Sequence, residues 1–301
     1  MKQPSKSTRP ANRGAQAKPR GLKTEQPPAS EQKAGGEPAP ATAVPTDLDW
    51  HDKLAKISGF AAVSALFKHE PLRVMRLYYE ERAKHQVGGW CAQMAKNRRP
   101  YRCVEEDELT RIAGTVLHGG VVAAAMPRAV YDLNFETAKS WAKAGQHLFI
   151  LDGVGNPHNL GAIARSLAFF GIRHLALSDH PEQSGISDAA HRVAEGGLEE
   201  LSIDRIKHLP DAIGKLRPYY HVVGTSLGGK AQPLTALGGI FRPIALILGN
   251  EEHGLPQATQ KACDTLVTIP ALGNMQSLNV SASAAIFAYE LTRRFAPTAG
   301  R

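Results

Sequence analysis

Short apolar runs that alternate with helical stretches constrain the fold of this chain more than any other feature. Between residues 147 and 294, six runs of four to six residues read as strands. One of them, Ile244–Leu248, is apolar at every position, which is typical of a strand buried on both faces of a parallel sheet. The expected strands are 147–151, 173–177, 198–203, 221–224, 244–248 and 265–269, and the expected helices are 160–170, 187–194, 206–216, 256–262 and 280–294. This half of the chain is predicted to be an α/β unit with a mostly parallel sheet covered on both faces.

The segment 51–128 also alternates between strands and helices and is predicted to be a small, separate α/β unit. We expect helices near 60–67, 80–96 and 105–112, and strands near 73–78, 101–104 and 121–125. A polar and partly helical linker, 129–145, joins it to the larger unit, which we expect to span 146–301.

The first 50 residues have a different composition. Eight of the 20 prolines lie before residue 49, and seven Lys and Arg residues precede the first acid, Glu25. Such a stretch has too few large apolar side chains to offset the entropy lost on folding. We expect a disordered, basic, Pro-rich arm, and a transit peptide is the weaker alternative because prolines break amphipathic helices.

The charge and the cysteines narrow the class of protein. The formal net charge of +8 divides into +3 for residues 1–50, +5 for 51–128 and 0 for 129–301. A polyanion would therefore be bound mainly by the first half, although a modest basic excess alone is common on solvated surfaces. Three scattered cysteines fit a reduced, cytoplasmic setting. No apolar run is long enough to span a membrane, so no membrane partner is expected.

Three fragments place glycine or small polar residues where an open α/β sheet builds its ligand crevice. The first is Asn156–Arg165, in which Asn156-Pro157 indicates a turn and Asn159 is a candidate helix cap. The second, Gly249-x-Glu251-x-x-Gly254, directly follows the apolar strand 244–248. The third, Ser277-Leu278-Asn279, precedes a helix that is rich in alanine and serine.

Taken in this order, the three fragments resemble the motifs of the SpoU (TrmH-like) family of RNA ribose 2'-O-methyltransferases, in the SPOUT superfamily, over roughly residues 146–295. The runs 57–63 and 117–123 more weakly resemble the small substrate-binding domain that often precedes that catalytic domain. The resemblance implies a trefoil-knotted methyltransferase domain, S-adenosylmethionine as cofactor, no metal, RNA (tRNA or rRNA) as partner and a homodimer.

The resemblance also implies roles for particular residues. Arg165 matches the family's essential arginine, which is implied to position the phosphate–ribose unit and to assist deprotonation of the 2'-hydroxyl; arginine is an awkward literal base because its pKa exceeds ~12. The other implied catalytic residues are Glu251, Ser277 and Asn279. The implied cofactor contacts are Thr225, Gly249, Ile269 and Leu278. The candidate RNA contacts are Asn159, Arg98, Arg99 and Arg102, of which the arginines flank Tyr101 and equally suit an ordinary solvated surface.

Two classes of function stay open at this point. One is methyl transfer to a ribose 2'-hydroxyl, and the other is an RNA-binding or assembly factor built on a methyltransferase-derived scaffold without turnover. Three other classes are excluded by spacing: Gly153-Val154-Gly155 lacks the third glycine of a dinucleotide site, Gly228-Gly229-Lys230 lacks the upstream loop of a P-loop, and no H-E-x-x-H zinc motif occurs.

Overall fold

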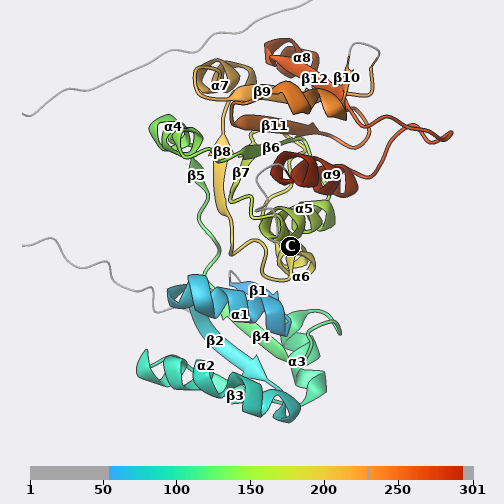
Figure 1. The fold of residues 1–301 in the computed structure, drawn as a ribbon. Coiled ribbons are helices and arrows are strands. Elements are labelled where there is room, and N and C mark those ends of the chain that lie inside the picture. Colours follow the sequence, from blue (N-terminus) through green and yellow to red (C-terminus); the bar gives the residue numbers. More distant parts are fainter. Residues whose placement is uncertain (1–53, 229–230, 294–301) are drawn as a thin grey trace, which may run out of the picture. The chain divides into compact units, whose positions relative to one another are not determined.

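The computed structural model describes residues 54–228 and 231–293. The predicted disordered arm, 1–50, lies outside these residues. Figure 1 shows the described part of the chain as two sheets with their covering helices.

The larger sheet carries eight described strands, and every neighbouring pair of them is parallel. Across the sheet they are β10 (Gln232–Pro233), β12 (Thr265–Thr268), β9 (His221–Thr225), β11 (Ile244–Gly249), β6 (Leu148–Asp152), β7 (His174–Ser178), β8 (Ser202–Ile206) and β5 (Tyr131–Asp132). Because parallel strands share one direction, their carboxyl ends lie along a single edge of the sheet. The predicted parallel α/β sheet is confirmed.

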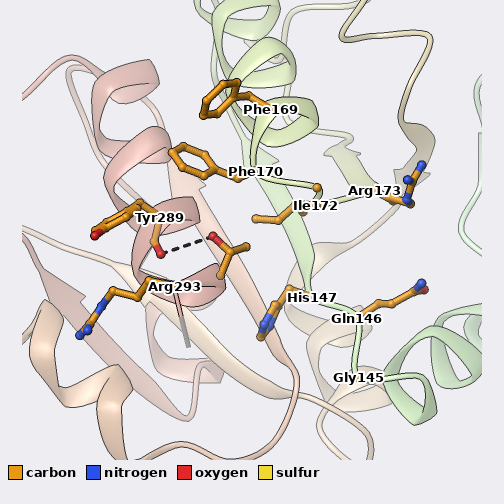
Figure 2. Close-up of a pocket in the computed structure, with 11 residues that line it drawn as sticks. Gly145, Gln146, His147, Phe169, Phe170, Ile172, Arg173, Tyr289 and Arg293 are labelled. Atoms are coloured by element: carbon orange, nitrogen blue, oxygen red, sulfur yellow. Dashed lines mark hydrogen bonds between the residues drawn. The ribbon is translucent and has the colours of Figure 1, made fainter. Parts of the chain in front are cut away.

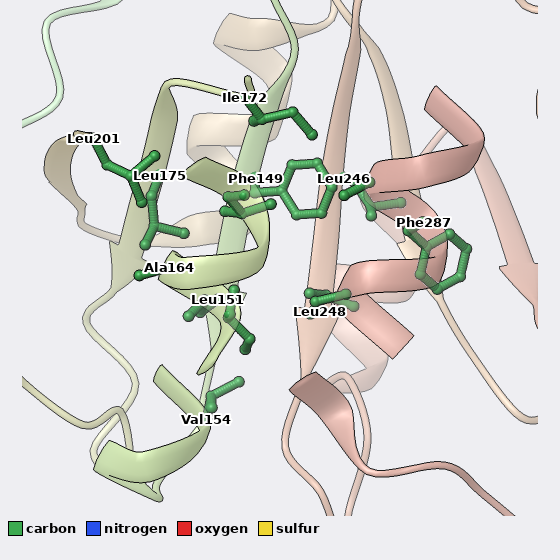
Figure 3. Packing of buried hydrophobic residues seen from close by; sticks show 14 of the residues in the cluster. Phe149, Leu151, Val154, Ala164, Ile172, Leu175, Leu201, Leu246, Leu248 and Phe287 are labelled. Atoms are coloured by element: carbon green, nitrogen blue, oxygen red, sulfur yellow. The ribbon is translucent and has the colours of Figure 1, made fainter. Parts of the chain in front are cut away.

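Both faces of this sheet are buried, which explains why its strands are apolar at successive positions. In β6, Phe149 and Leu151 point into one hydrophobic cluster, while Leu148 and Ile150 point into the other. Figure 3 shows the first cluster, where Phe149 projects from β6 on one face of the sheet and Phe287 packs from a helix. Alternate residues of a strand therefore pack into two separate cores, instead of one set packing into a core and the other facing solvent.

Two sets of helices cover these faces (Figure 1). The first cluster receives side chains from α5 (Pro157–Phe169), α6 (Asp188–Ala194) and α9 (Val280–Thr292), with the short helix η4 (Leu234–Gly239) beside it. The second receives them from α4 (Phe135–Lys143), α7 (Leu209–Leu216) and, at its edge, α8 (Gln257–Ala262).

Helices α5 and α6 approach each other closely through glycine. A Cβ at Gly161 would lie 2.5 Å from the carbonyl oxygen of Ala190 and 2.9 Å from Cβ of Val193. No real side chain tolerates such contacts, so the pair can pack this way only because residue 161 has none. The glycine of the first fragment thus sets the distance between two helices.

The smaller sheet has the order β1 (Ala55–Ser58), β4 (Val121–Ala125), β2 (Val74–Tyr79) and β3 (Tyr101–Cys103). Its pairings are antiparallel except for the parallel pair of β2 and β3. The covering helices are α1 (Phe60–His69), η2 (Pro71–Arg73), η3 (Glu81–Ala83), α2 (Lys84–Lys96) and α3 (Glu106–Ala113). Alternate residues of β4 face two cores, since Val121 and Ala123 pack in one cluster and Val122 in another.

The structure differs from the sequence predictions at the strand expected over 198–203. That strand, β8, begins at Ser202, and Leu198 and Leu201 are buried from the turn that precedes it. Apolar residues in a tight turn reproduce the pattern of a strand, which is why the prediction placed it four residues early. Strands β1, β5 and β10 were not predicted; β5 lies in the partly helical segment 129–145 and adds an edge strand beside β8.

No helix in the two described ranges is both long and apolar enough to cross a membrane.

A buried histidine predicts how stability should depend on pH. His174, at the start of β7, stacks on Trp141 with ring centroids 3.8 Å apart, and its Nε2 lies 2.7 Å from Oε1 of Gln146. Burial, and then the positive charge of Arg173, lower its pKa from the usual 6.5 to about 4. The unfolded chain therefore binds this proton first, and the free energy of unfolding should fall as the pH drops from 6.5 to 4.

Urea unfolding across that pH window measures the effect, at roughly 1.4 kcal/mol for each unit of pKa difference. In His174→Phe, which keeps a ring against Trp141 but cannot titrate, the same window should produce a smaller loss. An identical pH dependence in both proteins would show that His174 is not responsible.

Candidate active site

The pairing of β6 with β11 brings the first two sequence fragments together. Gly249, the last residue of β11, is in register with Asp152, the last residue of β6. The first fragment follows β6 and the second follows β11, so both loops leave the same edge of the sheet side by side. The third fragment enters α9, which packs against α5.

A chain of side-chain hydrogen bonds joins the three fragments. Nδ2 of Asn159 donates to Oε1 of Glu251 at 2.6 Å, and Nδ2 of Asn279 donates to Oδ1 of Asn159 at 3.1 Å. Asn159 is thus the central member, with its two amide atoms committed in opposite directions. Glu251 and Asn279 are exposed and Asn159 is half-buried, so the network faces the solvent-accessible side of the sheet edge.

The start of α5 frees Asn159 for this network. Asn156 is the N-cap, and its Oδ1 accepts from the backbone N–H of His158 at 2.8 Å. Pro157 occupies the first helical position, where a missing N–H carries no cost. The prediction that Asn159 caps this helix was wrong, because the helix begins three residues earlier than expected.

Asn279 caps a helix and also takes part in the hydrogen-bonded network. It is the N-cap of α9, and its Oδ1 accepts from the backbone N–H of Ser281 at 2.8 Å while its amide nitrogen reaches Asn159. Ser277 and Leu278 lie exposed in the preceding loop, and Leu278 retains 51% of its surface. An uncovered leucine beside the network leaves an apolar contact for a ligand.

The predicted cofactor contacts lie at neighbouring strand ends. In the sheet order β12–β9–β11, Thr225 ends β9, Gly249 ends β11 and Ile269 directly follows β12. Together with the exposed Leu278, they supply backbone atoms and apolar surface along one edge, which fits the demands of an adenosine-bearing cofactor. Oγ1 of Thr225 donates to the carbonyl of Ile247 at 3.1 Å, so that hydroxyl ties two strands together.

The structure gives a specific reason why residue 249 is a glycine. A Cβ there would lie 2.5 Å from the carbonyl carbon of Gly254 and 2.6 Å from the nitrogen of Leu255. The close approach is to the chain's own loop, which folds back over the end of β11. The glycine therefore shapes the loop that presents Glu251.

Asn250 organises this loop and was missed by the sequence analysis. Its Oδ1 accepts from the backbone N–H groups of Glu252 and His253, and its Nδ2 donates to the carbonyl of Gly153 and to Glu182. An Asn directly after a strand and before a turn is a known signal for such a side-chain turn. Asn250 thus ties the second fragment to the loop after β6.

Arg165 lies on α5 but outside the network. It is six residues beyond Asn159, or about 9 Å along the helix axis at 1.5 Å per residue. Its Nη1 lies 2.9 Å from Oε1 of Glu195, at the end of α6, and both side chains are more than half exposed. The structure therefore places the arginine in a surface ion pair, with a partner that the sequence did not identify.

A buried pair lies just beyond Glu195. Nδ1 of His191 is 3.0 Å from Oε1 of Glu199, and both side chains are almost fully buried. Burial by itself would raise the pKa of Glu199, but the adjacent imidazole of His191 outweighs burial and holds that pKa below its usual value. This pair fixes the turn between α6 and β8 from within.

The three candidate RNA arginines have different surroundings. Arg99 donates to the backbone carbonyls of Leu72, at 2.8 Å, and of Val74, which gives its guanidinium a structural role. Arg102 pairs with Glu108 at the surface, and Arg98 is exposed just after α2. RNA contact by these residues stays a prediction, and Arg98 and Arg102 have the accessible charge for it.

A cavity of about 580 Å³ lies at the opposite edge of the large sheet. Figure 2 shows its lining, with Gln146 and His147 before β6, Arg173 before β7, and aromatic side chains from α5 and α9. These positions precede the strands, whereas the three fragments follow them. The cavity is therefore separate from the candidate active site.

Two family models match the chain. The model described as the SpoU rRNA methylase family matches residues 146–289, and the model described as RNA 2'-O ribose methyltransferase substrate binding matches residues 56–130.

Curated relatives match over most of the chain. RlmB of Acinetobacter baylyi, a 23S rRNA (guanosine-2'-O-)-methyltransferase, is 32% identical over 244 residues, which cover 78% of this chain and 96% of the relative. YfiF of Escherichia coli O157:H7, described as an uncharacterized tRNA/rRNA methyltransferase, is 31% identical over 242 residues, which cover 79% of this chain and 68% of the relative.

Solved structures agree in fold. The AdoMet-bound rRNA methyltransferase from Sinorhizobium meliloti has a TM-score of 0.66 at 22% identity, covering 82% of this chain and 89% of that one. A structure described as an RNA 2'-O ribose methyltransferase has a TM-score of 0.64 at 22% identity, and the match covers 83% of this chain and 92% of that one. With three ordered fragments, a matching two-sheet architecture and relatives of this identity and coverage, the chain belongs to the SpoU rRNA methylase family.

Proposed function

We propose that this protein transfers a methyl group from S-adenosylmethionine to a ribose 2'-hydroxyl of ribosomal RNA. The observation that carries the proposal is the hydrogen-bonded chain Glu251–Asn159–Asn279, because it assembles one polar site from three separate parts of the sequence. Family membership supplies the reaction class. A surface formed without selection for a site would have no reason to join these side chains at one sheet edge.

The cofactor, when bound, supplies a methyl group on a positively charged sulfur. We assign its binding to the strand-end backbone of Thr225, Gly249 and Ile269 and to the side chain of Leu278, which line one sheet edge. The neighbouring Asn159–Glu251 pair adds acceptor oxygens next to this edge. Ser277, exposed in the same loop, remains a predicted pocket residue.

Arg165 is assigned to the RNA. A guanidinium donates in a rigid fork that matches phosphate, and it remains protonated in proteins, so it holds the phosphate–ribose unit and does not itself take the hydroxyl proton. As the methyl group moves from sulfur to the 2'-oxygen, that proton passes to water, which reaches the half-exposed Arg165. Holding the ribose oxygen in line with the methyl group contributes much of the rate in a displacement of this kind. Arg98 and Arg102 on the smaller sheet are the proposed additional phosphate contacts.

Ribosomal RNA is favoured over tRNA by the names of the relatives. The matching family model is described for rRNA, and the A. baylyi relative acts on a guanosine of 23S rRNA. The alternative, an RNA-binding factor without turnover, would place no demand on the Asn159 network. Its presence favours the enzyme, and RNA binding without any affinity for the cofactor would favour the alternative.

We infer that the protein works as a homodimer. Phe169 and Tyr289, on the neighbouring helices α5 and α9, are 83% and 56% exposed, and the ring of Phe170 lies between them (Figure 2). Contiguous exposed aromatic side chains are typical of a protein interface. A second copy is the partner that family membership supports.

Three further expectations stay proposals. They are the domain division at 51–128, 129–145 and 146–301, a trefoil knot around the cofactor loops, and a cytoplasmic location. The domain division is supported by the separate matches over 56–130 and 146–289. The location is supported by the free thiols of Cys91, Cys103 and Cys263.

Replacing Arg165 tests the proposed reaction. Ribosomal RNA from cells that lack the gene, incubated with tritiated S-adenosylmethionine, should gain ribose methylation from the wild type. Arg165→Ala should lower kcat/KM by about 100-fold or more, because a charged contact to the reacting unit is lost.

The matched control is Arg205→Ala, since Arg205 is also an exposed arginine in an ion pair, with Asp132. It should stay within roughly twofold of the wild type. Equal incorporation by Arg165→Ala and the wild type would remove Arg165 from the mechanism, and no incorporation by the wild type would reject the function itself.

Charging the aromatic surface tests the dimer. Phe169→Asp should convert a dimer into a monomer, measured by light scattering after gel filtration, because a carboxylate cannot be buried there without a partner. Tyr131→Asp, at another exposed aromatic residue, on the edge strand β5, is the control and should stay dimeric. A monomeric wild type, or a dimeric Phe169→Asp, would contradict this interface.

A further inference from the structure

The residue directly after α6 has an unusual backbone conformation. Glu195 adopts φ 46° and ψ 43°, in the left-handed region, and it is one of three described non-glycine residues with positive φ. This conformation costs free energy for any residue with a Cβ, and helices usually place glycine there. Gly196 follows directly and also has a positive φ, of 91°.

The contact made by the Glu195 side chain does not stabilise the fold enough to account for this conformational cost. Its carboxylate lies 2.9 Å from Nη1 of Arg165, but the two side chains are 52% and 57% exposed. Ion pairs between exposed side chains contribute little to stability because water screens them. The backbone strain at Glu195 is therefore not needed for stability. Because Glu195 lies next to Arg165, the residue assigned to the substrate, this strain indicates a functional role.

The backbone around this pair is held from both sides. A Cβ at Gly197 would lie 2.7 Å from Cα of Arg165, so the segment after Glu195 runs directly against the helix that carries the arginine. On the other side, the buried contact between His191 and Glu199 anchors the turn. The position of the Glu195 carboxylate is therefore set by packing and not by a free side chain.

The pair also borders open space. A cavity of about 470 Å³ includes both Arg165 and Glu195 in its lining, together with Ala168 and Gly197. The ion pair engages Nη1 of Arg165, which leaves Nε and Nη2 to donate to an incoming phosphate.

We propose that Glu195 is a positioning residue for methyl transfer, which acts through Arg165. The inference rests on the proposed function, since it assumes that Arg165 holds the phosphate–ribose unit. The carboxylate restricts a flexible side chain to one orientation, so the guanidinium meets the RNA with its fork already placed. The negative charge of the carboxylate also offsets the positive charge of Arg165. Glu195 therefore weakens the attraction between the free enzyme and RNA.

These two effects predict a separation of kcat from KM in Glu195→Gln. With gene-deletion ribosomal RNA as substrate, kcat should fall about tenfold, while KM for RNA should stay constant or fall. Binding of the same RNA in the absence of cofactor should become more salt-dependent, with the slope of log K against log salt steeper by up to about 0.9. A merely structural residue would not produce slower turnover together with equal or tighter binding.

A second variant separates function from folding. Glu195→Gly relieves the left-handed strain, so its Tm should rise while its kcat falls as in Glu195→Gln. Glu195→Asp keeps the charge and tolerates this backbone, and it should retain more activity than the glutamine variant. The control Asp132→Asn removes a carboxylate from a comparably exposed arginine pair and should leave kcat unchanged.

A double-mutant cycle decides whether Glu195 acts through Arg165. In the Arg165→Ala background, Glu195→Gln should cause no further loss of kcat. A further tenfold loss there, or wild-type kcat in both Glu195→Gln and Glu195→Gly, would overturn the positioning role while leaving the proposed function intact. A wild type that methylates no RNA would overturn both.

Discussion

The candidate active site depends on the two hydrogen bonds of Asn159. Its amide nitrogen donates to Glu251 and its amide oxygen accepts from Asn279, so one side chain connects parts of the chain that are 92 and 120 positions away. These bonds are possible because β6 and β11 are neighbours in register and release their loops at the same sheet edge. The position of the candidate site residues therefore follows from the pairing of two buried strands.

Helix α5 connects this network to the residue assigned to RNA. Asn159 lies in its first turn and Arg165 lies further along, so any shift of the helix would move both. Packing limits such shifts. Helix α6 approaches α5 at the van der Waals limit at Gly161, and the turn after α6 approaches α5 equally closely at Gly197. One rigid element thus carries both the centre of the polar network and Arg165, the cation that we assign to the substrate.

The fold could largely be predicted from the sequence because its strands are buried on both faces and read as apolar runs. Of the predicted site residues, Glu251 and Asn279 lie close together because each bonds to Asn159, which is central to the network instead of being a helix cap. Their catalytic roles stay predictions. Asn250 and Glu195 were missed because their roles depend on backbone geometry and on partners distant in sequence. The displaced start of β8 has a similar cause, since Leu198 is buried from a turn.

The most direct test of the account asks whether Asn159 and Asn279 act as one unit. Asn279→Ser retains a helix-capping oxygen but loses the N–H that reaches Asn159, so it removes the bond without removing the cap. Combined with Asn159→Ala in single-turnover methylation of ribosomal RNA, the double variant should be about as slow as the slower single variant. If the two losses multiply instead, the residues act independently, and a site organised around Asn159 is contradicted.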